Sequence, residues 1–274
     1  MEVLAETDDP GRLIAALEGN LWSAWSTLGL GDDCAAHKKR GALMVETPIR
    51  AFPYNMVQHF EGCDDPEGRV DHVVLHFGRR GVPFLWLITP TSRPEGFASL
   101  LEAKDMALIE SLSGMAAPLR QVIEARTALE ADVTISEATE SDLEELYSFI
   151  SSRRDVPDRD REAACAVYGN FRFGREGARA RFWIARDGGR VVGKCLLHCG
   201  AGVAGIHGVA TKPEARGRGI ARALTVEALS SAVKDGYEVG VPHSSQMAVT
   251  LYQGLGFREV ADFALYGPPD GFHV

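Results

Sequence analysis

Two hydrophobic patterns recur along the second half of the chain. Apolar residues three or four apart predict helices over 121–130, 141–151, 220–234 and 246–253, with a further short helix ending near 168. Alternating or continuous apolar runs predict strands over 131–136, 181–186, 191–198, 203–211 and 237–241, and from 257 onward. From residue 131 onward the resulting order is β, α, α, β, β, β, α, β, α, β. This order predicts an α/β fold built around a mixed sheet.

Local signals support two of these helices. Ser141 is the expected N-cap of the helix over 141–151, and Glu144 completes a capping box. The helix over 220–234 is expected to end at an Asp-Gly pair. Its predicted apolar side carries Ala223, Leu224, Leu229 and Val233.

The first 130 residues follow a less regular pattern. We expect a helix over 13–30, paired strands over 70–77 and 83–88, and a helix over 98–111. The order strand, strand, turn, helix parallels the middle of the second half, so a degenerate copy is one interpretation, although no sequence period establishes it. We therefore expect two domains, an N-terminal α/β domain over 1–125 and a second domain over 132–274.

Composition and charge narrow the function classes. The 274 residues suffice for one large domain or two modest ones, and 45% hydrophobic with 24% charged residues is typical of a globular chain. The net charge of −9 divides into −7 for residues 1–130 and −2 for residues 131–274. Because neither part carries a basic excess, we expect no nucleic-acid partner, and a cationic small molecule is favoured instead.

The N-terminus and the cysteines bear on the environment of the protein. No apolar run approaches the ~18–20 residues of a membrane span, and the acidic first residues lack the basic segment of a signal peptide. We therefore expect a cytoplasmic protein with no membrane partner. The five cysteines are too irregular for a disulfide framework, so free thiols are expected. Cys195 and Cys199 would lie about 13 Å apart on a strand, with His198 on the opposite face, so we expect no metal.

The stretch 208–221 has the features of an anion site. A predicted strand enters a glycine-containing turn and a helix begins at once, so successive backbone N–H groups form a positive cup suited to a pyrophosphate. Gly217 and Gly219 let phosphates approach the main chain, and Arg216 and Arg218 add charge at the rim. The P-loop spacing is absent, and the third glycine of the dinucleotide-binding fingerprint is missing.

Two motifs carry a specific resemblance. Arg216-Gly217-Arg218-Gly219-Ile220-Ala221 matches the Arg/Gln-x-x-Gly-x-Gly/Ala signature of the Gcn5-related N-acetyltransferase (GNAT) superfamily. The segment 245–257 resembles the superfamily's Asn-x-x-Ala-x-x-Leu-Tyr-x-x-x-Gly-Phe motif. The resemblance covers 132–274 and implies a GNAT fold, with a central, mixed but mostly antiparallel sheet flanked by helices. The segment 1–125 is reminiscent of chains in which a degenerate GNAT half precedes an active one.

The resemblance also implies acetyl-coenzyme A as the acyl donor. It implies that the amides from Arg216 to Ala221 hold the pyrophosphate, that the strand backbone at Val209 and Thr211 pairs with the pantetheine arm, and that the Val209 N–H polarises the thioester carbonyl. Ser245 stands where the family often has an asparagine that contacts the coenzyme. The expected coenzyme-binding residues are Val209, Ala210, Thr211, Arg216, Gly217, Arg218, Gly219, Ile220, Ala221, Ser245, Ala248 and Tyr252.

Three residues are candidates for proton transfer. Tyr252 matches the family's proton donor to the leaving thiolate, but a phenol of pKa ~10 needs help from its surroundings to protonate a thiolate of ~8.5. Packing under the coenzyme is its alternative role. His207 occupies the register of the family's usual glutamate base and could accept a proton near neutral pH, with a structural role as the alternative. His243, where the sheet of this fold splays open, is the next candidate.

These features predict an acetyl-coenzyme A-dependent N-acetyltransferase, monomeric or homodimeric. It would act on a primary amine of a small molecule or peptide by direct attack in a ternary complex. One alternative is a coenzyme-binding pseudoenzyme or sensor without turnover, and another is transfer of a larger acyl group or transfer to a hydroxyl. The N-terminal part lacks the coenzyme signature. We therefore expect it to bind no coenzyme and either to form part of the acceptor wall or only to stabilise the catalytic domain.

Overall fold

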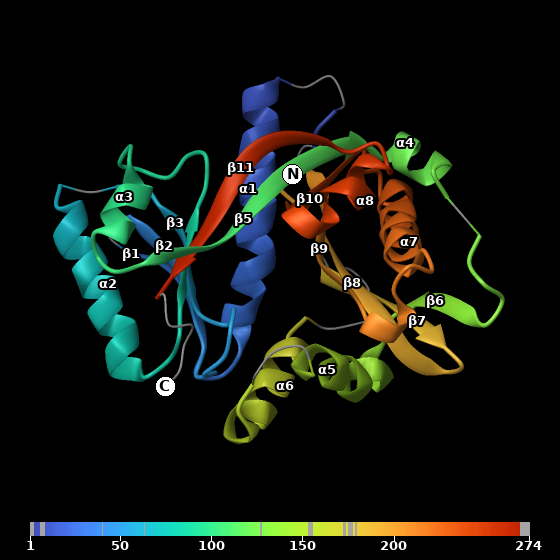
Figure 1. Ribbon diagram of the computed structural model, residues 1–274, viewed down its shortest axis with the longest axis horizontal. Helices are drawn as coiled ribbons and strands as arrows, with labels where there is room; N and C mark the ends of the chain where they lie inside the picture. The colour runs from blue at the N-terminus through green and yellow to red at the C-terminus, as the bar shows by residue number, and fades with distance from the viewer. Residues whose placement is uncertain are drawn as a thin grey trace. The chain divides into compact units, whose positions relative to one another are not determined.

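The chain forms two compact units. The computed structural model, drawn in Figure 1, describes residues 3–5, 9–39, 41–62, 64–126, 128–152, 156–171, 174, 178 and 180–268. Unit 1 comprises residues 1–24, 113–150 and 171–261, and unit 2 comprises residues 25–112, 151–170 and 262–274. The predicted domains 1–125 and 132–274 do not coincide with these units, because each predicted domain contributes segments to both.

Unit 1 is built around a mixed sheet with the strand order β5-β10-β9-β8-β7-β6. Its strands are the end of β5 (Ala107–Pro118), β6 (Val133–Glu137), β7 (Ala180–Asp187), β8 (Arg190–Gly200), β9 (Val203–Thr211) and β10 (Val239–Ser245). Neighbours from β6 to β9 pair antiparallel, whereas β9 and β10 pair parallel. The predicted mixed sheet, with mostly antiparallel pairs, is confirmed.

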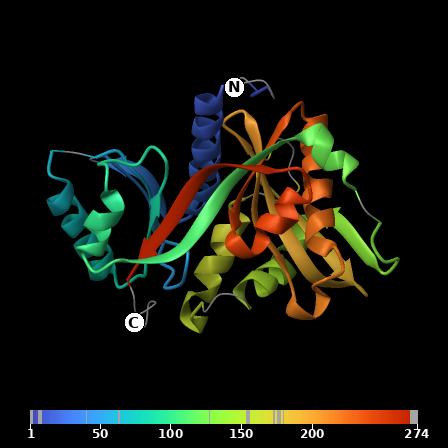
Figure 2. The same cartoon turned by 45° about the horizontal axis from the view of Figure 1, so that its top comes forward.

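Two helices cover opposite faces of strands β8 and β9 (Figures 1 and 2). α7 (Ile220–Lys234) packs on the face that carries Leu197 and Ile206, within the main hydrophobic core of unit 1. α1 (Pro10–Ser26) covers the other face, where its Asn20 bonds to the β8–β9 hairpin. The other helices of unit 1 are α4 (Leu119–Glu124), α5 (Leu143–Ser151), α8 (Val249–Gln253) and the 3₁₀ turns Glu140–Asp142, Pro213–Ala215 and Gln246–Ala248.

Unit 2 has its own mixed sheet, with the strand order β1-β2-β3-β4-β11. Its strands are β1 (Ala35–Lys39), β2 (Ala42–Glu46), β3 (Met56–Phe60), β4 (Leu85–Ile88) and the end of β11 (Arg258–Gly267). Only β3 and β4 pair parallel among these neighbours. Its helices are α2 (Pro66–Arg80), α3 (Phe97–Glu102), α6 (Arg161–Gly169) and the 3₁₀ turns Thr27–Leu30 and Asp158–Asp160.

The two units repeat one topology. In unit 2, the antiparallel strands β1, β2 and β3 are followed by α2, the parallel strand β4 and the short helix α3, and β5 then ends in the sheet of unit 1. In unit 1, β7, β8, β9, α7, β10 and α8 follow in the same order with the same pairing, and β11 then ends in the sheet of unit 2. The chain therefore contains a repeat, but its elements differ from the ones that the sequence predicted for the first half.

The prediction of paired strands over 70–77 and 83–88 is wrong for the first of them. Residues 70–77 lie inside α2, and Val70, Val73 and Phe77 are all buried at helical spacing. Asp65 accepts a hydrogen bond from the Gly68 amide at 2.9 Å and so caps the helix. A valine-rich segment with high strand propensity is therefore helical, because it lays one apolar stripe on the sheet of unit 2.

Smaller differences concern element ends. The predicted helix over 98–111 stops at Glu102, and β5 begins at Ala107. The capping box before α5 consists of Thr139 and Asp142 instead of Ser141 and Glu144. Val233, expected on the apolar side of α7, is 41% exposed.

A further prediction, on the cysteines, can be compared with the described residues. Their four cysteines, Cys34, Cys165, Cys195 and Cys199, are free thiols as predicted, and Cys63 lies outside the described residues. None of the described helices is long and apolar enough to cross a membrane.

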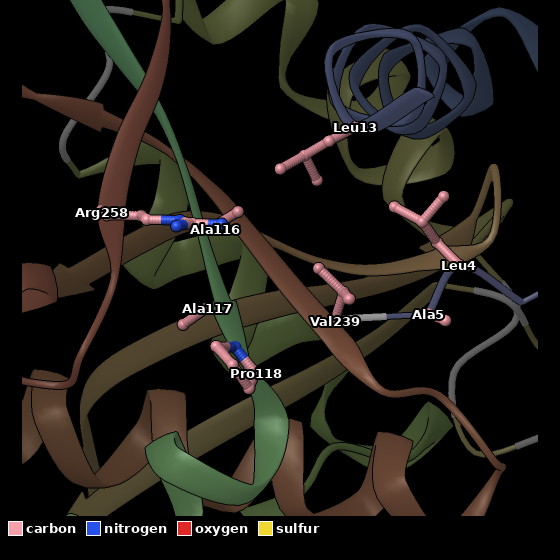
Figure 3. Close-up of a pocket in the computed structure, with 8 residues that line it drawn as sticks. All are labelled: Leu4, Ala5, Leu13, Ala116, Ala117, Pro118, Val239 and Arg258. Carbon is pink, nitrogen blue, oxygen red and sulfur yellow. The ribbon is translucent and has the colours of Figure 1, made fainter. Parts of the chain in front are cut away.

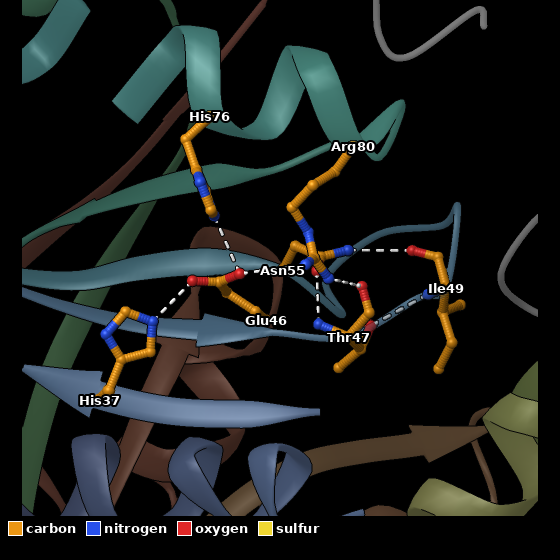
Figure 4. A network of polar contacts seen from close by, with 7 residues as sticks. All are labelled: His37, Glu46, Thr47, Ile49, Asn55, His76 and Arg80. Atoms are coloured by element: carbon orange, nitrogen blue, oxygen red, sulfur yellow. Dashed lines mark hydrogen bonds and ion pairs between the residues drawn. The ribbon is translucent and has the colours of Figure 1, made fainter. Parts of the chain in front are cut away.

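A buried carboxylate ties together three elements of unit 2 (Figure 4). Glu46 of β2 accepts hydrogen bonds from His37 of β1 at 2.6 Å and from His76 of α2 at 2.9 Å, and it lies 3.3 Å from Arg80. Burial by itself would raise the pKa of Glu46, but the two histidine bonds and the charges of His76 and Arg80 outweigh it and lower the pKa. The network therefore anchors α2 to the sheet.

Candidate functional site

The sheet of unit 1 opens where β9 and β10 part. These strands pair in parallel only from Ala204–Gly240 to Ile206–Pro242. Beyond that point β9 remains paired with β8 as far as Thr211, but it has no ladder partner on the β10 side among the described strands. One edge of β9 therefore presents backbone donors and acceptors to an opening between two strands.

A β-bulge lies at this opening. His207 pairs with Leu196 and Ala210 pairs with Lys194, so Gly208 and Val209 together oppose a single residue of β8. Gly208 has φ 53°, a left-handed conformation that glycine adopts without strain. The bulge changes the alternation of side chains, and it turns Val209 toward the core under α7. The register of β9 is thus altered at the residues predicted to face the thioester.

The N-terminus of α7 is open to an anion. Gly217 and Gly219 have φ 78° and 76°, and Gly219, the N-cap residue of the helix, has no side chain that could cap the first turn. A Cβ atom added at either glycine would meet nothing within 4 Å. The first amides of this helix therefore point into free space with the positive end of the helix dipole, an arrangement suited to a phosphate group.

The two arginines of the turn differ in their surroundings. Arg218 bonds to Asp187 and to Glu130, each at 2.5 Å, and lies 3.7 Å from Asp132. These carboxylates raise the pKa of Arg218 and compensate its charge. Arg216 is exposed and makes no ion pair with any described residue. Of the two predicted rim charges, only that of Arg216 is left uncompensated, and Arg218 instead fastens the turn to β7.

The equivalent helix of unit 2 is closed to anions. Asp65 occupies the N-terminus of α2, and Pro66, at its first position, has no N–H group. Glu67 adds a further negative charge to the first turn. A phosphate would therefore meet carboxylates at α2, whereas at α7 it would meet unoccupied amides.

His207 lies at the opening, on the α1 side of the sheet. It is 8% exposed, and its Nε2 lies 2.9 Å from Oδ1 of Asn20. Its ring stacks on that of His243, with centroids 6.0 Å apart and planes 13° apart, and lies 6.4 Å from the ring of His198. Burial, followed by the nearby His243, His198 and Lys194, holds the pKa of His207 well below its usual range. The imidazole is therefore neutral at physiological pH.

His243 belongs to β10, two residues before the strand ends. Burial lowers the pKa of His243 to about 3, so its ring is also neutral. The structure thus brings together the two histidines that the sequence predicted as alternative bases. His207 and His243 face each other across the point where β9 and β10 part.

Tyr252 of α8 lies on the opposite side of the sheet. It belongs to the core under α7, and its ring packs edge-on against Phe257 with centroids 5.6 Å apart. Burial, and next the neighbouring Cys195, raise the pKa of Tyr252 above its usual range. The phenol is therefore protonated throughout the physiological range, but it is a weaker acid than a free phenol.

Ser245 and Ala248 complete the predicted set. Ser245 ends β10 and precedes the 3₁₀ turn, and Ala248 packs against the core under α7. Ile220 and Ala221 form the first turn of α7, at the predicted phosphate cup. The predicted residues thus come from three places: the parting strands, the start of α7, and the turn that leads into α8.

One residue of this site was not identified from the sequence. Asn20 of α1 is 0% exposed and bonds to His207, which lies 187 residues away in the chain. The available signal is an asparagine on the apolar stripe formed by Leu17, Leu21 and Ala24, all of them buried. The pattern marks Asn20 as a buried polar residue, but it contains nothing that names His207 as its partner.

A small hollow elsewhere in unit 1 is too narrow to hold a coenzyme (Figure 3). Its volume is about 40 Å³, against the ~300–1,000 Å³ typical of ligand sites. It lies beside the first residue of β10, whereas the opening follows the paired part of that strand. Its lining residues are Leu4, Ala5, Leu13, Ala116, Ala117, Pro118, Val239 and Arg258.

Comparisons with known proteins agree on one fold. A family model described as an acetyltransferase (GNAT) domain matches residues 178–259. A GCN5-related N-acetyltransferase from Kribbella flavida superposes with a TM-score of 0.65 at 15% identity, covering 91% of this chain and 94% of its own.

Two further solved structures are similar. A tandem GNAT protein from the clavulanic acid biosynthesis pathway gives a TM-score of 0.59 at 11% identity, covering 97% of this chain and 96% of its own. A GCN5-related N-acetyltransferase from Sphaerobacter thermophilus gives 0.55 at 18% identity, covering 83% and 80%. No curated protein matches. Identities this low show the fold alone.

Proposed function

Because a family model of the GNAT acetyltransferase domain matches residues 178–259, we propose that the protein is an acetyl-coenzyme A-dependent N-acetyltransferase. It transfers the acetyl group to a primary amine of a small molecule or peptide by direct attack in a ternary complex. One observation carries the proposal. The part of β9 that borders the opening is followed along the chain by the N-terminus of α7, where the N-cap residue is a glycine. A strand edge followed by a phosphate cup suits an extended ligand with a pyrophosphate at one end.

The residues at the opening fit such a ligand. The amides from Arg216 to Ala221 would bind the pyrophosphate, helped by the uncompensated charge of Arg216. The backbone from Val209 to Thr211 would pair with the amide groups of the pantetheine arm, since this edge has no ladder partner among the described strands. On the side of the ligand away from β9, the lining residues would be Ser245, Ala248 and Tyr252. When bound, acetyl-coenzyme A would supply the acyl group as a thioester.

His207 is the proposed general base. It is neutral because burial depresses its pKa, so it can accept a proton from the acceptor amine directly or through one water. His243 stacks on it and is neutral as well, and it remains the second candidate. The net charge of −9 suits an acceptor that arrives as a cation.

Tyr252 is proposed to serve the leaving group. Its phenol is protonated and belongs to the core on the face of the sheet opposite to His207. It can therefore donate a hydrogen bond, and then a proton, to the sulfur, while His207 accepts a proton from the amine. Because burial makes this phenol a weak acid, proton transfer depends on a thiolate held close to the hydroxyl.

The test is release of free thiol. The protein is incubated with acetyl-coenzyme A and a panel of primary amines, and thiol is followed by a colorimetric reagent, with binding measured in parallel by calorimetry. We expect binding in the absence of amine and amine-dependent thiol release. Binding without release for every amine would favour the sensor over the enzyme, and absence of binding would overturn both.

Two other reactions remain alternatives to this proposal. Competition by longer acyl-coenzyme A thioesters would identify a larger acyl group as the natural donor. Thiol release with hydroxyl compounds but not with amines would identify O-acylation. Both alternatives use the same phosphate cup, so only the panel of acyl donors and acceptors separates them.

A further inference from the structure

The orientation of the Asn20 amide is fixed by its surroundings. Its Nδ2 lies 3.0 Å from the carbonyl oxygens of His198 and Gly200, and 3.3 Å from that of Val203. Carbonyl oxygens only accept hydrogen bonds, so the NH₂ group must face them. The amide oxygen consequently faces Nε2 of His207, at 2.9 Å.

This orientation selects one tautomer of His207. An amide oxygen cannot donate a hydrogen bond, so Nε2 of His207 must carry the proton that joins the two groups. The ring is neutral, so Nδ1 then holds the free lone pair. Among the described residues, none is hydrogen-bonded to Nδ1 of His207.

The neighbouring backbone leaves room for this hydrogen bond. A Cβ atom at Gly205 would lie 1.9 Å from Oδ1 of Asn20 and 2.6 Å from Nε2 of His207. On α1, a Cβ atom at Gly19 would lie 3.1 Å from the Cβ of Ala201, in the turn between β8 and β9. Two glycines, one on each partner, thus allow the helix to approach the hairpin closely enough for Asn20 to reach the histidine.

We propose that Asn20 is a positioning residue for acyl transfer: it holds His207 in the tautomer protonated on Nε2, so that Nδ1 accepts the proton of the acceptor amine. The inference rests on the proposed function. In that step the acceptor, which has already lost its ammonium proton to solvent, bonds through its neutral amine nitrogen to the acyl carbon. The carbon–sulfur bond breaks with its electron pair on sulfur, and one amine proton moves to Nδ1. The resulting imidazolium keeps its Nε2–H bond to the amide oxygen, which stabilises the charge.

The same helix offers a matched control. Ser23 lies one turn after Asn20 on α1, and its Oγ is 2.9 Å from Nε2 of His198. This bond ties the same helix to the same hairpin, but it does not touch His207. Ser23→Ala therefore removes a comparable contact and leaves the proposed tautomer in place.

The first measurement reads the tautomer without reference to activity. Protein labelled with ¹⁵N-histidine is examined at neutral pH by long-range proton–nitrogen correlation, with His207→Gln used to assign the signal. We expect His207 to be protonated on Nε2 in the wild type and in Ser23→Ala, and to lose this preference in Asn20→Leu. Protonation on Nδ1 in the wild type would overturn the proposal, whatever the variants do.

The second measurement is kinetic. Asn20→Leu should lower kcat by about tenfold to hundredfold, less than the ~10²–10⁴-fold that general-base catalysis itself contributes, with the KM for acetyl-coenzyme A within about twofold. Ser23→Ala should stay within about twofold in both constants. Unchanged turnover in an Asn20→Leu protein that has lost the tautomer would remove Asn20 from the mechanism.

A second variant distinguishes a folding defect from the loss of the Asn20–His207 hydrogen bond, and the tautomer measurement distinguishes this proposal from the proposed function. If Asn20→Leu does not fold, Gly205→Ala reaches the same hydrogen bond from the strand, and it should give the same loss of tautomer preference and of kcat. If the wild type shows the Nε2–H tautomer and binds acetyl-coenzyme A but releases no thiol, the proposed function fails and with it the role of Asn20 in transfer. The tautomer itself would then stand as a structural finding.

Discussion

Gly219→Ala tests the phosphate cup with a single added methyl group. Gly219 precedes α7 with φ 76° and ψ 4°, and a Cβ atom there would meet nothing within 4 Å. The substitution therefore causes no clash, and its whole effect comes from the left-handed backbone, which costs an L-residue roughly 1–2 kcal/mol. The backbone can relieve this strain only by rotating toward negative φ, which turns the first amides of α7 away from the bound phosphate.

The expected loss of affinity follows from those amides. A hydrogen bond to a charged group contributes about 1.5–3 kcal/mol, and each 1.4 kcal/mol is a factor of ten in Kd. Misalignment of one amide should thus weaken acetyl-coenzyme A binding by about tenfold or more. Calorimetric titration measures this Kd directly, and urea denaturation of the same samples gives the cost in stability.

Gly96→Ala is the matched control for this substitution. Gly96 precedes α3 in unit 2 with φ 76° and ψ 18°, and a Cβ atom there also meets nothing within 4 Å. Both variants should lose a similar free energy of unfolding, but only Gly219→Ala should lose affinity. Equal affinity of Gly219→Ala and the wild type, or an equal loss in Gly96→Ala, would refute the assignment of the cup to the start of α7.

Three further predictions concern named side chains of the site. Tyr252→Phe should lower kcat by ~10²-fold or more while the Kd for coenzyme stays within about twofold; equal rates would remove the phenol from the mechanism. His207 must be neutral to accept a proton, and its pKa is lowered, so the wild-type kcat should fall only well below pH ~6.5. His207→Ala should abolish that acidic limb, and an unchanged profile would assign the histidine a structural role. Arg216→Gln should weaken coenzyme binding by about two- to fivefold, whereas Arg218→Gln should mainly lower stability; the reverse result in titration and denaturation would contradict the ion pairs of Arg218.

The sequence was most informative where local pattern and packing agree. The bounds of α7 follow from its apolar spacing and the glycines before it, and the strands β7 to β9 from their apolar runs. α2 was misread because Val70, Val73 and Val74 have high strand propensity, and only the sheet of unit 2 reveals which of them share a buried face. At this segment tertiary packing, and not the strand propensity of the valines, determines the secondary structure.

From the sequence, the residues of the site could be predicted where they lie in short motifs, but the contacts between distant segments could not. Its motifs marked Gly217, Gly219 and Tyr252, since those residues lie within short continuous segments. The bulge at Gly208 and the carboxylates around Arg218 depend on strand register and on distant segments, which no local pattern encodes. Asn20 is the extreme case, because its partner lies 187 residues away.

The exchange of segments between the two units has a consequence for biosynthesis. Unit 1 uses α1 from the start of the chain and β11 up to Ala261, while unit 2 needs residues from 262 onward. Neither unit can be completed on the ribosome until the chain has been made to about residue 262. Leu17 and Leu21 are buried beside Asn20 on α1, and the bonding partners of Asn20 lie in the β8–β9 hairpin. Until that hairpin has been made, a nascent chain of this topology presents an apolar helix face for which chaperones and wrong partners compete.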